Sequence, residues 1–268
     1  MPIKTFQQIL TEAVADVIEH GYDNPERIDE WVKQLREAAS SSLGTPEEIE
    51  DKIRLSLRAI YDRNVKYGAI LKKRNPKIPR FTLQNIEPML RNELDKRIQA
   101  SANLIKLNRE KAIEQVLQRY SGWATSIPAG GSEAVDRREV KKGIAKSLKQ
   151  MSFEERRVAV DQSFKLVSSI SAVVAIQTNA IALEWHSHWR QAGYNYRPDH
   201  KDRDLKIYAI RDSWAIQKGL MNRGAGFSDE ITQPGEEIFC RCFASYFTNL
   251  VDLPESMLTQ KGRDYLND

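Results

Sequence analysis

Two cysteines separated by one residue, Cys240-Arg241-Cys242, lie near the C-terminal end of this 268-residue chain. In an extended strand, residues i and i+2 point to the same face, so both thiols could meet one ligand. Zinc is bound by four thiolate, imidazole or carboxylate ligands, and His200 with Asp199 or a second histidine could complete the set. Cys-x-Cys is far less specific than paired Cys-x-x-Cys units, so both cysteines can also be read as small core residues. We expect no cofactor other than a candidate zinc ion at His200, Cys240 and Cys242.

Two further groups could be mistaken for reactive sites. His186 and His188 fall where a helix is expected to end, and residues two apart on a helix do not share a face. Asp199, His200 and Asp202 could form a metal-dependent nuclease only if their carboxylates converged on a metal, whereas contiguous charges in a loop usually diverge into solvent. No Gly-rich phosphate loop, nucleophile elbow or zincin pair is present. We therefore expect that the protein is not an enzyme, with the nuclease as the least favoured alternative.

Basic side chains are concentrated in the middle of the chain. The net charge of +4 conceals 5 basic and 12 acidic residues in 1–53, followed by 22 basic and 9 acidic residues in 54–150. Such a segment can contact phosphates without sequence specificity, can form solvated helix faces or can pair with the acidic N-terminal segment. Aromatic residues between the cations are sparse, which argues against stacking on single strands. The candidate contacts for DNA or an acidic partner are Lys72, Lys73, Arg74, Lys77, Arg80, Arg137, Arg138, Lys141 and Lys142.

Composition excludes several classes of protein. Hydrophobic residues make up 41% and charged residues 29% of the chain, which suits a packed core and argues against disorder. Two cysteines cannot supply a disulfide framework for this length, so a reducing compartment is expected. The longest apolar run, near 170–176, is far shorter than the roughly 20 residues of a membrane span. No membrane partner is expected.

The elements that must position these residues are mostly helices. Apolar residues at helical spacing predict helices over about 6–20 and 25–40. Thr45 and Glu48 form a capping box that starts a third helix, and Pro88 begins a fourth that runs through Leu117. An exposed basic loop over 72–80 and a Gly/Pro linker over 121–132 interrupt them. The spacing further predicts a short basic helix over about 135–149.

The pattern of the sequence changes in the last part of the chain, where short strands are predicted after a long helix. A second capping box, Ser152 to Glu155, predicts a helix of about forty residues ending at Gly193. Short strands are expected around 207–209 and 214–216, the best strand over 237–248, and a short helix from Leu253. The fold class is therefore mainly α, with an elongated helical body followed by a small α+β C-terminal module with a short antiparallel sheet. The expected domains are residues 1–80, 81–193 and 194–268.

The order of residues in the C-terminal part resembles that of a known family. A long helix with Gln177-Thr178-Asn179 is followed by tryptophans, by a charged loop containing His200, and by Pro234-Gly235 leading into Cys240-Arg241-Cys242. This order is similar to that of the phage Mu F-like head-morphogenesis proteins, which are minor capsid proteins of tailed phages. The family often places its histidine after an Asp-x-Arg element, whereas His200 here precedes Asp202-Arg203.

The resemblance implies a structural minor head protein bound at the portal or inner capsid, acting in head assembly, genome packaging or ejection. It implies a virion location inside the head near the portal, and the host cytoplasm during assembly. The implied partners are the portal protein, the major capsid or scaffold protein and packaged DNA, with several copies per particle. The alternative from a different class is a non-specific nucleic-acid-binding protein that uses the basic middle segment.

Overall fold

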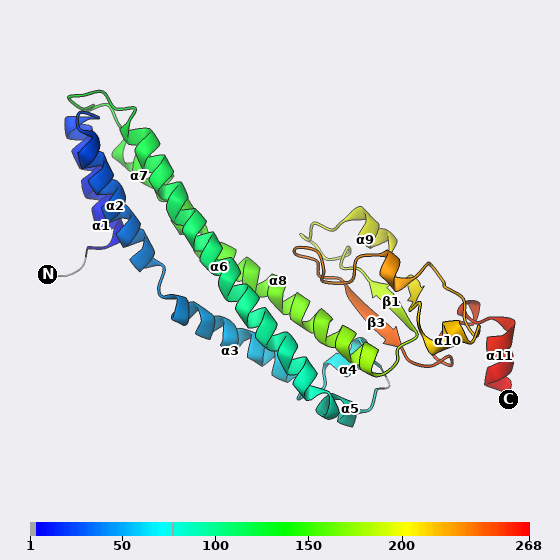
Figure 1. The fold of residues 1–268 in the computed structure, drawn as a ribbon. Coiled ribbons are helices and arrows are strands. Elements are labelled where there is room, and N and C mark those ends of the chain that lie inside the picture. The colour runs from blue at the N-terminus through cyan, green and yellow to red at the C-terminus, as the bar shows by residue number, and fades with distance from the viewer. Residues whose placement is uncertain (1–3, 77) are drawn as a thin grey trace. The chain divides into compact units, whose positions relative to one another are not determined.

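Helices make up most of the computed structural model, and a small antiparallel sheet follows the helical body near the C-terminal end (Figure 1). The predicted fold class is confirmed in these respects. The structure describes residues 4–76 and 78–268, apart from the side chain of Lys73. Two compact units are present, one built from residues up to Ile53 with Ala100–Val158, the other from Arg54–Gln99 with Ala159–Asp268. The contiguous domain boundaries stay a prediction, and the units are described one at a time.

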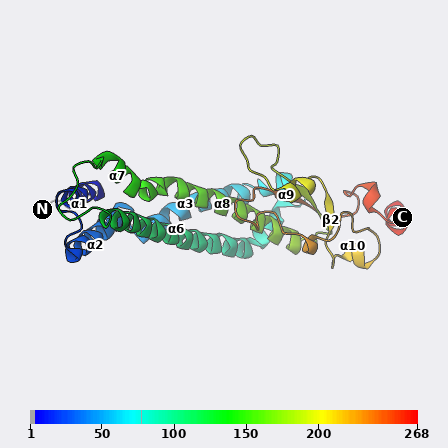
Figure 2. The same cartoon turned by 90° about the horizontal axis from the view of Figure 1, so that it is seen from above.

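The first unit is a packed group of helices. Its elements are α1 (Phe6–His20), α2 (Pro25–Ser42), the start of α3 (Pro46–Asn64), the later part of α6 (Glu87–Ala124), α7 (Arg137–Ile144) and the start of α8 (Lys146–Gln177). Both α2 and α7 lie beside α1 (Figure 2). The apolar stripes meet in a core around Leu10, Val17, Leu35 and Tyr120, all with side chains fully or almost fully buried. Helical periodicity in the sequence thus becomes one shared apolar interior.

Local signals set several helix ends in this unit. The Thr5 hydroxyl accepts from the backbone of Gln8, and the Asn24 side chain accepts from Glu26 and Arg27 at the start of α2. The predicted capping box at Thr45 is confirmed, since the Glu48 carboxylate accepts from the Thr45 backbone and the Glu48 N–H donates to the Thr45 hydroxyl. Such caps satisfy backbone groups that the first helical turn leaves unpaired.

Two predicted boundaries are wrong. Ser152 lies inside α8, which already begins at Lys146, so the second capping box does not start a helix. Ser147, near that start, instead donates its hydroxyl to the carbonyl of Ala112, a tertiary contact that the local pattern could not reveal. The expected loop over 72–80 is also shorter, because α4 (Ile70–Lys73) and α5 (Arg80–Asn85) enter it from both sides.

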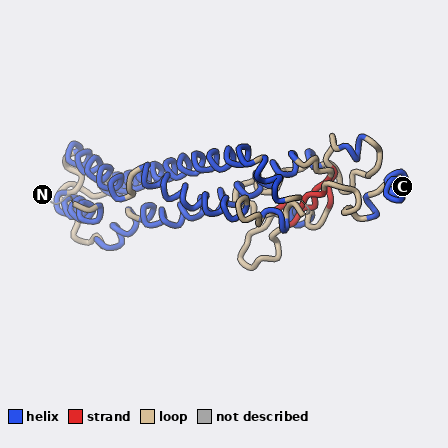
Figure 3. The backbone as a smooth tube through the Cα atoms, turned by 90° about the horizontal axis from the view of Figure 1, so that it is seen from below, coloured by secondary structure: helices blue, strands red, loops and turns tan. Residues whose placement is uncertain are grey.

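The second unit is built around a three-stranded antiparallel sheet in the order β2-β1-β3. The central strand β1 (Ala182–His186) pairs Leu183 with Tyr208 of β2 (Ile207–Ala209) and with Tyr246 of β3 (Phe243–Phe247). Short helices and 3-10 turns lie among its loops (Figure 3). They are α9 (Pro198–Asp202), α10 (Trp214–Gln217), η1 (Ser228–Glu230), η2 (Glu255–Met257) and α11 (Gln260–Asn267).

Three predictions in this unit need correction. The helix expected to reach Gly193 ends at Gln177, where the chain turns through Asn179 with a left-handed φ of 52° and becomes β1. The apolar run of α8 continues into Ala182 and Leu183 of β1, which made this segment look like more of a buried helix. The segment expected as a strand near 214–216 is α10, and only 243–247 of the strand expected over 237–248 pairs. The strand at 207–209 is confirmed.

One helical stretch, Arg137–Gln177, is by length and composition apolar enough to cross a membrane. The core helix of a soluble protein passes the same test. In the second unit, Leu166, Ile170 and Val174 of this stretch are fully buried. These three side chains lie inside the protein, as those of a core helix do, whereas Phe153, Val160 and Ile176 of the same stretch are exposed.

Candidate metal centre

His200, Cys240 and Cys242 come from three positions in the second unit. Pro198 occupies the first turn of α9, where its fixed φ favours helix formation, and this places His200 in the middle of that helix. Cys240 lies in the loop before β3, and Cys242 immediately precedes that strand. The N–H of Phe239, a residue with a left-handed φ of 60°, donates to Asp161 Oδ1 of α8 at 2.7 Å. This bond fixes the cysteine loop to the long helix.

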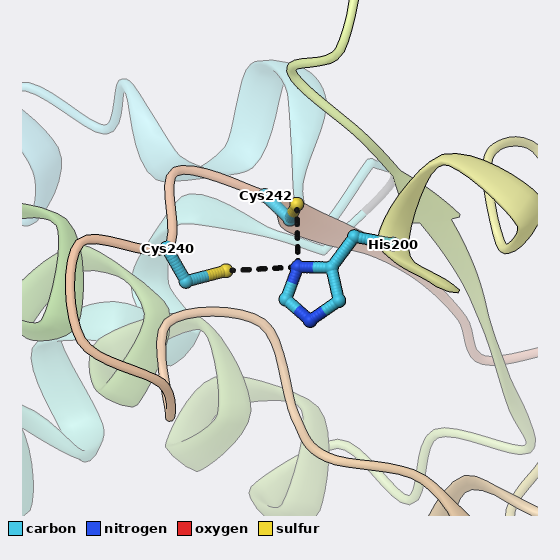
Figure 4. Close-up of side chains that lie close together, drawn as sticks. All are labelled: His200, Cys240 and Cys242. Atoms are coloured by element: carbon cyan, nitrogen blue, oxygen red, sulfur yellow. Dashed lines mark hydrogen bonds between the residues drawn. The ribbon is translucent and has the colours of Figure 1, made fainter. Parts of the chain in front are cut away.

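The three side chains converge on one point (Figure 4). His200 Nδ1 lies 3.7 Å from Cys240 Sγ and 3.5 Å from Cys242 Sγ. The exposed fractions are 1% for His200, 0% for Cys240 and 1% for Cys242. The sequence pattern grouped these residues, and the structure brings them together in a buried cluster in which each offers one metal-ligating atom within 4.8 Å of the others.

The surroundings of the two sulfurs differ. A hydrogen bond from Cys242 is the main cause that lowers the pKa of Cys240 to about 6, and the N–H of Gly235, 3.4 Å from Cys240 Sγ, acts in the same direction. The same bond between the cysteines, together with burial, raises the pKa of Cys242. Ser187 Oγ lies 3.9 Å from Cys242 Sγ. The hydrogen bond between the two cysteines thus acts in opposite directions on the pKa values of the two thiols.

The other ring nitrogen of His200 faces carboxylates. Nε2 lies 3.5 Å from Glu237 Oε1 and 3.8 Å from Asp199 Oδ2, and it makes no direct hydrogen bond within the part of the chain that is described. Each carboxylate is also paired with an arginine, Glu237 with Arg197 and Asp199 with Arg203. A histidine whose one nitrogen faces acceptors while the other faces sulfurs is held in one ring orientation.

Aromatic residues close the space around the cluster. The Trp185 ring meets the His200 ring edge-on with centroids 5.2 Å apart, and the Arg203 guanidinium lies over Trp185. The Tyr194 hydroxyl accepts from the Arg241 N–H and donates to the Phe239 carbonyl, both at 3.2 Å. The loop between the cysteines is thus tied down at its backbone as well as at its sulfurs.

The remaining histidines of this region do not join the cluster. His186 lies in β1 and not at a helix end, which corrects the expectation; its ring stacks on Phe243 with centroids 4.6 Å apart. Ser245 Oγ at 3.0 Å and a Glu184 carboxylate oxygen at 3.4 Å both approach His186 Nε2. A catalytic triad needs the carboxylate on the other ring nitrogen, so this group does not have the geometry of a relay. Burial lowers the pKa of His188.

The proposed nuclease residues separate in the structure. Asp199 and His200 are neighbours, but Asp202 is exposed and belongs to neither of the metal-ligating groups found among the described residues. The residue that sequence reasoning missed is Glu237. The sequence feature that could have pointed to Glu237 is its position three residues before Cys240. In the structure the Glu237 carbonyl accepts from the Cys240 N–H in a turn.

The predicted basic contacts fall in both units. In the first, Arg137 and Arg138 are exposed, Lys142 pairs with Glu139, and Lys141 donates to Thr11. In the second, Lys72 is exposed and Arg80 donates to the Lys66 carbonyl. Arg74 instead lies over the Phe243 ring and donates to Ser168, and burial lowers its pKa to about 10. Lys77 and the side chain of Lys73 lie outside the described residues.

A spacious pocket lies elsewhere in the second unit. It has a volume of about 860 Å³ and is lined by residues that include Ile176, Leu183, Trp214 and Tyr246. None of the three clustered residues lines it. Its walls are mainly apolar, so the chemistry-bearing cluster and the large cavity are separate features.

Comparison of the chain with models of protein families, with curated proteins and with solved structures found no match.

Proposed function

We propose that this chain is a structural minor head protein of a tailed phage that binds at the portal or inner capsid. The observation that carries the proposal is the convergence of the residues on which the family resemblance rests. Trp185 packs on His200, His200 contacts both cysteines, and Gly235 donates to Cys240. Residues widely separated in sequence therefore form one packed cluster, as expected if the shared order describes a module and not a chance spacing.

The position of Pro234-Gly235 gives further support. Gly235 has a left-handed φ of 85°, and a Cβ atom placed on it would approach the Ser168 hydroxyl on α8 to 2.9 Å. A side chain here would both strain the backbone and push the loop away from the helix. The glycine that precedes the cysteine pair in the resemblance thus has a physical role in seating that loop.

Mass spectrometry of purified procapsids and mature particles tests the proposal. The particles must come from a lysate in which the chain is expressed. We expect the chain in a small, fixed number of copies relative to the major capsid protein, and co-purification with the portal protein after mild disruption. Its absence from both kinds of particle would contradict the proposal.

A second candidate function, non-specific binding of nucleic acid, is favoured by α7 and the start of α8. Arg137, Arg138, Lys146 and Lys149 are exposed and make no ion pair with a carboxylate of the described residues. Cations without protein partners are available for phosphates.

The salt dependence of DNA binding tests this function. Duplex DNA affinity is expected to fall steeply and linearly with salt on logarithmic axes, with a slope of about −0.9 per phosphate neutralised. Arg137→Ala with Arg138→Ala should make the slope shallower by about 2, whereas Lys142→Ala, which removes a cation already paired with Glu139, should change it less. A slope near zero in the unchanged chain would exclude this function.

A further inference from the structure

We propose that His200 Nδ1, Cys240 Sγ and Cys242 Sγ bind one Zn²⁺ ion, which fastens α9 to the loop that leads into β3. The proposal goes beyond the head-protein function and does not depend on it. It rests on the separations of the ligand atoms, on the partners of the surrounding charges and on the way the loop is held.

The separations fit a tetrahedral site. With Zn–S distances of about 2.3 Å and Zn–N distances of about 2.0–2.1 Å, tetrahedral angles place sulfur and nitrogen ligands about 3.6 Å apart. The two sulfur-to-nitrogen distances are 3.7 Å and 3.5 Å. The ion would therefore fit between the three atoms with little movement of the backbone.

The carboxylates near His200 Nε2 are already paired with arginines, which favours metal binding at Nδ1, on the side of the two sulfurs. Asp199 and Glu237 could form an alternative group with Nε2, but each carboxylate already has an arginine partner, Arg203 and Arg197 respectively. The sulfurs have no cationic partner of this kind within the described chain. Glu237 instead lies 3.5 Å from Nε2, so a small movement would let it accept the Nε2 proton and leave the Nδ1 lone pair for the ion. Metal-binding histidines are commonly oriented by such a carboxylate.

The donor set selects the metal. Two thiolates and an imidazole favour zinc over the hard cations magnesium and calcium, which prefer oxygen ligands. No further His, Cys, Asp or Glu atom in the described residues joins the group with both sulfurs, so the fourth position of the ion would be open to a water molecule. Binding releases the remaining thiol protons to solvent, because the thiolate forms are the ligands.

The structural effect follows from what the ion would connect. The segment from Ser187 to Cys242 consists mainly of loops, with two short helices, one 3-10 turn and one three-residue strand. Zinc would join His200, in α9 within this segment, to Cys240 and Cys242 at its end, all at buried positions. We infer that the ion stabilises the fold of this segment. The ligand side chains are at most 1% exposed, so a substrate could not reach the ion.

Metal analysis of the full chain, purified without chelators, is the first test. We expect about one zinc per chain, and loss of the metal from Cys240→Ser, Cys242→Ser and His200→Asn. His20 is exposed and belongs to the first unit, so His20→Gln is the matched histidine control and should keep the metal. Metal below about a tenth of stoichiometry, together with no uptake of added zinc by the unchanged chain, would overturn the proposal.

Cobalt substitution identifies the ligands without relying on variants that fail to fold. Co²⁺ added to the metal-stripped chain should give the charge-transfer absorption of sulfur ligands and the visible bands of four-coordinate cobalt. Cobalt could instead bind without the sulfur absorption, and Asp199→Asn but not Cys242→Ser could abolish that binding. This result would place the metal at Asp199, His200 and Glu237 and would overturn the proposal.

The outer carboxylate provides a graded test. Glu237→Gln should weaken zinc affinity by about 10-fold to 100-fold while the sulfur absorption of the cobalt form persists. The neighbouring Glu236→Gln, whose side chain caps Gln233 and does not face His200, should leave affinity unchanged. Equal affinities of the two variants would contradict the role assigned to Glu237.

Discussion

The first unit and the part of the second unit that surrounds the sheet, residues 159–268, are stabilised in different ways. We call this second part the module. In the first unit, α1 and α2 each carry a continuous apolar stripe, and the N-terminal end of each is capped by the side chain of the residue that precedes it. In the module, short strands and turns are joined by contacts between distant positions, such as Asp161 with Phe239 and His200 with Cys240. Helices with local caps and a shared apolar core make up the one, whereas hydrogen bonds between distant positions hold the loops of the other.

This difference shows which unit tolerates changes at single sites. A long helix distributes its burial over many side chains, so one truncation removes a fraction of the interaction. A loop-rich module with few strands depends for its stability on a few buried polar and aromatic groups. The following substitutions test that contrast.

The largest effect is expected for Trp185→Ala. Trp185 is fully buried in the central strand and packs on His200, so truncation should destabilise the module by about 3–5 kcal/mol. Thermal unfolding followed by near-ultraviolet circular dichroism measures this change, while most of the helical far-ultraviolet signal should persist. Trp185→Phe is the control, since it retains a ring and removes an indole N–H for which the described residues supply no hydrogen-bond partner. Simultaneous loss of both signals would show that the two units unfold as one.

A core truncation in the first unit should have a comparable but smaller effect. Leu35 is fully buried between the helices, and Leu35→Ala should cost about 2–5 kcal/mol, depending on how far the helices close the cavity. Chemical denaturation followed at the helical signal checks this expectation. Leu55→Ala, at an exposed position, is the control. If Leu35→Ala changed module signals more than helical ones, the assignment of separate cores would be wrong.

Asp161→Ala tests how the cysteine loop is anchored. The Asp161 carboxylate accepts from the Phe239 N–H and pairs with Lys165 at 3.0 Å, so its removal should cost about 1.5–3 kcal/mol. Hydrogen exchange should quicken in the loop before β3 more than in α1 or α2. Asp161→Asn retains an acceptor for the N–H and should restore part of the protection. Unchanged exchange in that loop would contradict the anchoring role.

The smallest effect is expected at a helix cap of the first unit. The Asn24 side chain accepts from two backbone N–H groups at the start of α2, and Asn24→Ala should cost about 1 kcal/mol. Asn24→Asp keeps an acceptor and should retain most of the stability. Equilibrium unfolding in urea measures both variants, and a loss as large as that of Leu35→Ala would indicate a role beyond capping.

Much of the first unit could be predicted because its signals are local. The spacing of Phe6, Leu10 and Val17 indicated α1, and the Thr45 capping box set the start of α3. Ser152 shows where this approach fails: its side chain lies within a helix whose start is fixed near Ser147 by contact with Ala112. A capping pattern is evidence for a helix start only when the preceding residues leave the helix.

The candidate site was predicted in part. The types of His200, Cys240 and Cys242 indicated soft-metal chemistry, but the reason given for the shared face, an extended strand, does not hold at Cys240, which precedes β3 in a loop. Glu237 could not be assigned to the site beforehand, because its approach to His200 depends on where α9 packs.

The sequence by itself determined the helical body and the three residues able to bind a soft metal, because apolar periodicity, caps and ligand chemistry are carried by residue types and short spacings. Tertiary structure alone decided that the chain after Gln177 becomes the central strand β1 and that His200 meets both sulfurs. Leu183 pairs with Tyr208 and Tyr246, far along the chain, so the partners that make this segment a strand cannot be found in its local sequence.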